Sequence, residues 1–101
     1  MELIIRRRAA CAIQEIFARY EGEQPGLGFE FLSCIEAATS AIARSAEACP
    51  IFYLEFRRRR LRRFPYLLYY RVFDSFVALA VAFHANRDPR DLYALPEDGG
   101  A

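Results

Sequence analysis

The first half of the chain repeats apolar residues with helical spacing. Ile13, Ile16, Phe17 and Tyr20 fall at i, i+3, i+4 and i+7, which is the spacing of one apolar stripe on an amphipathic helix. A second set repeats with helical spacing, and its members are Leu27, Phe31, Cys34, Ile35, Ala38 and Ile42. The pattern predicts two helices in this half.

A short Pro-Gly segment separates the two helical patterns. Gln24-Pro25-Gly26-Leu27-Gly28 stops the first helix, because proline lacks an amide donor and glycine permits backbone angles closed to other residues. Pro50 ends the second segment. Two amphipathic helices joined in this way form an antiparallel hairpin, whose remaining apolar face needs a second layer.

The rest of the chain supplies that layer as strands. Leu3-Ile4-Ile5 is a short β-branched run, and residues 66–72 and 77–83 alternate along their length, as strands do. Phe73-Asp74-Ser75-Phe76 suits a hairpin turn between these two. Residues 56–63 form the preceding strand. We therefore expect one α+β domain over residues 1–101, with a two-helix hairpin packed on one face of a small, mainly antiparallel sheet in the order β-α-α-β-β-β.

Alternation also assigns side chains to the two faces of the sheet. The face covered by the helices is expected to hold Leu68, Tyr70, Val72, Val77, Leu79, Val81 and Phe83. The other face is expected to hold Leu67, Tyr69, Arg71, Ala78, Ala80 and Ala82. In the preceding strand, Arg58, Arg60 and Arg62 share one face.

Charge is unevenly placed along the chain. The formal net charge is only +1, yet residues 57–71 carry seven Arg and no acidic residue. Like charges this dense repel unless an anion or an acidic partner is near, so the segment indicates a surface that binds something negative. The alternative is a solvated edge strand, on which charge deters pairing with other sheets.

Several classes of protein do not fit the sequence. The three cysteines, Cys11, Cys34 and Cys49, are odd in number and have no CxxC spacing, so we expect no disulfide framework, metal site or cofactor. The longest apolar run, residues 76–83, is far shorter than the roughly 20 residues that span a bilayer. There is no signal-peptide pattern. We expect a cytoplasmic protein without membrane contact.

Three motifs together resemble the RelE/ParE toxin superfamily of bacterial type II toxin–antitoxin systems, which includes plasmid-stabilisation proteins. They are the PGLG sequence at residues 25–28, the FPY sequence at 64–66 and the RDP sequence at 87–89. The resemblance extends over about residues 2–93. It implies a growth-inhibiting toxin that a cognate antitoxin holds inactive. ParE-like members inhibit DNA gyrase, whereas RelE-like members cut messenger RNA in the ribosomal A site.

The resemblance also maps the nuclease pattern onto this chain. Its two basic sheet positions fall on Arg58 and Arg60, its later arginine on Arg87 and its terminal tyrosine on Tyr93. Its central strand arginine falls on Leu67. That departure removes a cation expected to stabilise the transition-state phosphate, an effect of about 2.7–4 kcal/mol per donor in other enzymes. It favours the ParE-like alternative, a protein that is not an enzyme.

Acid–base chemistry gives the same preference. Cleavage of RNA by its 2′-hydroxyl needs a proton acceptor, and arginine stays protonated at any working pH. Only His84 and Tyr93 remain as candidates, and a histidine at a strand end is more often structural.

A binding role is therefore the main expectation. We expect the target or the antitoxin to contact Arg58, Arg60, Arg62, Leu67, Tyr69, Arg71 and Arg87. An apolar groove bordered by the two helices and the open sheet face, and ringed by arginine, suits an amphipathic, acidic partner segment. The functions left open are inhibition of DNA gyrase, ribosome-dependent cleavage of mRNA, and a degenerate member that acts only through antitoxin and operator regulation.

Overall fold

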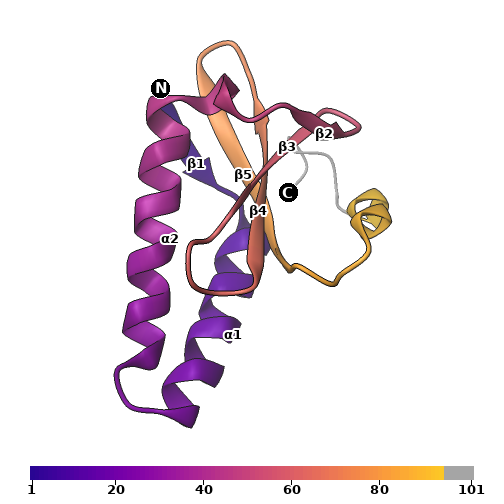
Figure 1. Ribbon diagram of the computed structural model, residues 1–101. Coiled ribbons are helices and arrows are strands. Elements are labelled where there is room, and N and C mark those ends of the chain that lie inside the picture. Colours follow the sequence, from indigo (N-terminus) through magenta and orange to yellow (C-terminus); the bar gives the residue numbers. More distant parts are fainter. Residues whose placement is uncertain (95–101) are drawn as a thin grey trace.

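The computed structural model of the chain describes residues 1–94 as two layers, a five-stranded sheet and a helical hairpin on one of its faces (Figure 1). The elements in chain order are β1 (Glu2–Ile5), α1 (Arg7–Glu23), α2 (Leu27–Arg44), the 3-10 turn η1 (Ala46–Ala48), β2 (Ile51–Tyr53), β3 (Phe56–Arg60), β4 (Tyr66–Val72), β5 (Phe76–His84) and the 3-10 turn η2 (Pro89–Ala94). The α+β class and the helical hairpin are confirmed.

The sheet has the order β1-β5-β4-β3-β2. Only β1 and β5 run parallel, and the other neighbours are antiparallel, as the mainly antiparallel prediction requires. Two details differ from expectation. The three-residue strand β2 was not predicted, and β3 ends at Arg60 instead of residue 63. The Leu61 amide donates to the Tyr66 carbonyl at 3.0 Å, which closes the loop between β3 and β4 early.

A carboxylate of α1 fixes the turn between the helices. Glu21 accepts hydrogen bonds from the amides of Gly26 at 2.8 Å and Gly28 at 2.9 Å. These amides belong to the first turn of α2, where backbone donors lack intrahelical partners and a negative charge is favoured. Gly26 takes a left-handed conformation with φ of 93°, which glycine adopts without steric cost.

The helix-facing core is confirmed for β4 and the first half of β5. It joins the apolar faces of α1 and α2 to Leu68, Tyr70, Val77 and Leu79. Tyr70 is fully buried, and its hydroxyl donates to the Ala46 carbonyl at 2.8 Å. This bond ties η1, at the end of the helical layer, to the middle of the sheet.

The predicted facing of the second half of β5 is wrong. Tyr69 pairs with Val81 but Tyr70 pairs with Leu79, so β5 holds one extra residue opposite this point. Such a β-bulge reverses the alternation beyond it. Val81 and Phe83 consequently lie on the face away from the helices, whereas Ala82 faces the helical layer.

Two glycines near the hairpin give a matched test of helix packing. A Cβ on Gly28 would lie 2.8 Å from Phe17 Cδ1 and from the Phe17 carbonyl oxygen, whereas one on Gly22 would meet nothing within 4 Å. We expect Gly28→Ala to destabilise the fold by about 1–3 kcal/mol and Gly22→Ala to stabilise it by about 0.5–1 kcal/mol. Urea unfolding of both variants measures this. Equal midpoints would contradict the close helix contact.

Tyr70 gives a test in alkaline solution. Burial is the main cause that raises the pKa of its hydroxyl in the folded protein. Below the unfolded pKa of about 10 both states hold the proton, and above it the unfolded chain loses the proton first, so stability falls as pH rises. We expect urea midpoints to fall between about pH 9 and pH 11, and Tyr70→Phe to reduce that slope. An unchanged slope would refute this role.

Candidate interaction surface on the basic sheet

The arginine-rich strand β3 lies between β2 and β4, and its register sets the direction of each side chain. Arg58 pairs with Tyr69 and Arg60 pairs with Leu67, so both arginines lie on the face opposite the helices. Arg57 and Arg59 alternate with them and lie on the helix side. The predicted alternation is therefore confirmed from Arg57 to Arg60, whereas Arg62 lies in the loop after the strand.

The face opposite the helices is not open to solvent. Leu67 and Tyr69 are only 9% and 1% exposed, and they form a second apolar cluster with Phe83 and Leu92. Leu92 belongs to η2, which lies across the sheet from the helices (Figure 1). Leu67 and Tyr69 were both expected to contact a partner. They are instead buried beneath the side chains that cover this face, and they support those side chains.

Arg58 is held by its neighbours. Its guanidinium carbon lies 3.5 Å from the centroid of the Phe52 ring, and one of its nitrogens donates to the Tyr69 hydroxyl at 3.4 Å. A cation over an aromatic face is attracted by the ring quadrupole. Arg58 thus fastens β2 to the sheet as well as carrying charge.

Several arginines near the sheet have carboxylates of the same chain beside them. Arg71 bonds to Glu55 at 3.1 Å, and Arg87 bonds to Asp91 at 2.8 Å. The remaining pairs are Arg57 with Glu47, Arg63 with Glu30, and Arg90 with Asp88. Arg57 also donates to the Cys49 carbonyl at 2.6 Å. The Arg90 guanidinium, by its hydrogen bonds, lowers the pKa of the Asp88 carboxyl.

Two exposed arginines differ from these. Arg60, at the end of β3, and Arg62, in the following loop, are exposed, and no carboxylate within residues 1–94 forms an ion pair with either. We call Arg60 and Arg62 the basic pair. The predicted cationic surface is therefore smaller than the sequence indicates, because contacts within the chain hold Arg57, Arg58, Arg63 and Arg71.

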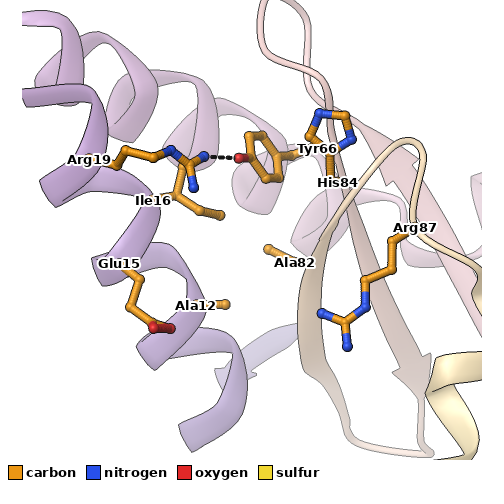
Figure 2. Close-up of a pocket in the computed structure, with 8 residues that line it drawn as sticks. All are labelled: Ala12, Glu15, Ile16, Arg19, Tyr66, Ala82, His84 and Arg87. Atoms are coloured by element: carbon orange, nitrogen blue, oxygen red, sulfur yellow. Dashed lines mark hydrogen bonds between the residues drawn. The ribbon is translucent and has the colours of Figure 1, made fainter. Parts of the chain in front are cut away.

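A cleft on the helix side holds a second group of polar residues. Its volume is about 470 Å³, and it lies between α1 and the end of β5 (Figure 2). The residues that line it are Ala12, Glu15, Ile16, Arg19, Tyr66, Ala82, His84 and Arg87. Arg19 donates to the Tyr66 hydroxyl, and this bond is the main cause that raises the pKa of Arg19. Sequence reasoning missed this contact, which joins residues 47 positions apart.

His84 and Tyr93 are the two candidate proton acceptors. Nδ1 of His84 accepts the Asn86 amide at 3.0 Å, so the neutral ring carries its proton on Nε2 and presents a donor to the cleft. His84 also packs edge-on against Tyr66, with ring centroids 5.3 Å apart. Both contacts fit a structural histidine. Tyr93 lies in η2, and its side chain lies outside the described part of the structure.

The described residues contain no group of three or more His, Cys, Asp or Glu side chains that could hold a metal ion. None of the helices within residues 1–94 has the length and apolar character needed to cross a bilayer.

Comparison with known proteins supports the fold. No family model and no curated protein matches the sequence. Among solved structures, the chain is similar to a chain of the chromosomal ParDE TA system from P. aeruginosa, with a TM-score of 0.73 and 18% identity. The match covers 83% of this chain and 95% of that chain. It confirms the fold expected from the resemblance to the RelE/ParE superfamily.

Arg58 and Arg60 provide a matched test of the two kinds of arginine. We expect Arg58→Ala to destabilise the protein by about 0.5–1 kcal/mol, because it removes the contact of the guanidinium with the Phe52 ring. Arg60→Ala is expected to change stability by less than about 0.5 kcal/mol. Urea unfolding of both variants checks this. Equal losses would contradict the assignment of Arg58 to the fold.

Proposed function

We propose that this chain is the toxin of a type II toxin–antitoxin system, of the ParE kind, and that a cognate antitoxin neutralises it. One observation carries the proposal, namely the fold shared with a chain of a ParDE TA system over 83% of the sequence. The three motifs at residues 25–28, 64–66 and 87–89 support it independently, because they occur in the order and at the separations of that superfamily.

The proposed target is DNA gyrase, and the basic pair forms part of the contact. Both arginines are exposed and have no carboxylate partner among the described residues. Exposed charge of this kind accelerates and orients association with an oppositely charged surface. Arg58 and Arg71 lie on the same face but are engaged with the chain's own side chains, so their contribution is to shape and fasten it.

The alternative, a ribosome-dependent RNA endonuclease, has weaker support. RNA cleavage needs a group that takes the 2′-hydroxyl proton. Near this face, Glu55 and Asp91 are paired with Arg71 and Arg87, and His84 points its polar edge toward the opposite side of the sheet. Leu67 stands where the nuclease pattern has an arginine, and it is buried. Binding chemistry is therefore favoured over catalysis.

The antitoxin is expected to present an acidic, amphipathic segment. The chain offers exposed arginines such as Arg60 and Arg62 and exposed apolar side chains such as Phe29 and Phe52, which are 60% and 42% exposed. A partner that buries the apolar rings and neutralises the arginines complements both features. Co-expression with the product of the adjacent reading frame should then rescue growth and give a complex that co-purifies.

Paired activity assays test the target. Purified toxin is added to a gyrase supercoiling reaction and, separately, to a translation reaction in which mRNA cleavage is mapped. We expect inhibited supercoiling and intact mRNA. The double variant Arg60→Glu/Arg62→Glu should weaken gyrase inhibition by about tenfold or more, since it reverses both charges of the contact.

The matched control is Arg7→Glu/Arg44→Glu, which makes the same charge change at exposed positions of the helical layer. It is expected to inhibit gyrase as the unaltered toxin does. Cleavage of mRNA without an effect on supercoiling would overturn the gyrase assignment in favour of the endonuclease. If neither activity is found and no antitoxin co-purifies, the proposed function itself is wrong.

A further inference from the structure

The sheet has a free edge beside the cleft. β1 pairs with β5 only along residues 76–79, and the chain then turns into α1 at Arg7. β5 continues to His84, so its last five residues have no strand neighbour on that side within residues 1–94. An unpaired strand edge presents backbone donors and acceptors that can pair with another chain.

The register shows which peptide groups face this edge. The Ala85 amide donates to the Pro65 carbonyl at 2.8 Å, toward β4. Pairs of residues in an antiparallel ladder alternate between bonded and non-bonded. The pairs Ala82 with Leu68 and His84 with Tyr66 are therefore the non-bonded ones. The amides of Ala82 and His84 consequently point away from β4, toward the free edge, and so does the Ala82 carbonyl.

The cleft gives room for a chain at this edge. Its floor is made by small side chains, Ala12 from α1 and Ala82 from β5, and the volume is about 470 Å³ (Figure 2). That volume accommodates a few residues of extended backbone. Larger side chains at these two positions would fill the cleft.

The charges around the cleft favour an acidic occupant. Arg19 lies on the α1 wall, and Arg87 lies on the opposite wall after the end of β5 (Figure 2). Arg19 bonds to a neutral hydroxyl and Arg87 to a single carboxylate, so both keep donors for a further acceptor. Glu15 is the one carboxylate among the residues that line the cleft, and it excludes an acidic residue next to itself.

We propose that the antitoxin inserts an extended, acidic segment into this cleft and pairs with Ala82 and His84 as an added strand beyond the end of β1. A carboxylate of that segment binds between Arg19 and Arg87, and a neutral or basic residue lies beside Glu15. Main-chain hydrogen bonds provide affinity in this mode of recognition, and the flanking charges provide specificity. The inference rests on the proposed function, because it assumes an antitoxin partner.

Amide hydrogen exchange tests the added strand directly. Exchange is followed by NMR for free toxin and for toxin in complex with the product of the adjacent reading frame. In free toxin, the Ala82 and His84 amides should exchange much faster than those of Val81 and Phe83, which bond to β4. In the complex, the first two should slow by about a hundredfold or more.

Two pairs of variants test the cleft itself. Ala12→Leu fills the cleft, and Ala18→Leu makes the same change at an exposed position on α1 that does not line it. Arg87→Glu reverses a charge that lines the cleft, and Arg90→Glu reverses a nearby exposed one that does not. The first variant of each pair should weaken antitoxin binding by about tenfold or more, and its control should bind nearly as the unaltered chain does. Thermal unfolding of each variant checks that it is folded.

The outcomes separate the two proposals. An antitoxin that binds while the Ala82 and His84 amides keep their fast exchange would overturn the added strand and leave the toxin assignment intact. Equal binding by the cleft variants and their controls would overturn it as well. If the adjacent product does not bind at all, the toxin assignment fails and this inference fails with it.

Discussion

The β-bulge in β5 determines how both faces of the sheet are used. Opposite the step from Tyr69 to Tyr70, β5 holds one residue more than β4. After the bulge, the larger side chains Val81 and Phe83 point away from the helical layer and pack with Tyr69 and Leu92 in the second cluster. Ala82 takes their place facing α1. Ala82 therefore lies opposite Ala12 of α1, and the cleft forms because neither of these small side chains fills the space between α1 and the sheet.

The position of Phe83 beyond the bulge also affects the contacts of Arg87 and, through Tyr69, those of Arg58. Phe83 on the far face gives Arg87 an aromatic surface, 4.3 Å from guanidinium to ring centroid, and supports Tyr69, whose ring lies 5.6 Å away. Tyr69 in turn receives the Arg58 side chain. Arginines that were expected to project freely are thus drawn onto rings and carboxylates of the chain. Such contacts hold the guanidinium groups in place, and the carboxylates among them offset part of the mutual repulsion.

Local sequence signals predicted the helices and most strands. The facing of side chains in β5 and the short strand β2 depend on long-range contacts and were not predicted. The helix spacing of Ile13 to Tyr20 and the Pro-Gly break need only neighbouring residues, and both helices formed as expected. The predicted facing of Val81 and Phe83 depended on an uninterrupted alternation, and the seven alternating residues from 77 to 83 contain no signal that marks where the extra residue is inserted. Strand β2 is three residues long, too short for a periodic signal.

The candidate site was predicted only in part for a related reason. Composition identified Arg58, Arg60 and Arg62, but charge pairing is a property of the folded chain. Arg71 on β4 pairs with Glu55 in the turn between β2 and β3, and Arg63 in the loop after β3 pairs with Glu30 on α2. Neither pairing can be read from spacing along the sequence.

Arg60 and the cleft lie at the same end of the sheet, on opposite faces. Arg60 pairs with Leu67, which pairs with Phe83, and His84 follows directly. β3 and β5 are two strand spacings apart, roughly 10 Å, which about three residues of extended chain can cross. A single short arm that pairs with β5 can therefore continue around this end and reach Arg60 and Arg62. In the proposed mode of neutralisation, the strand pairing anchors the arm, and its acidic residues cover Arg60 and Arg62, which have no carboxylate partner within residues 1–94.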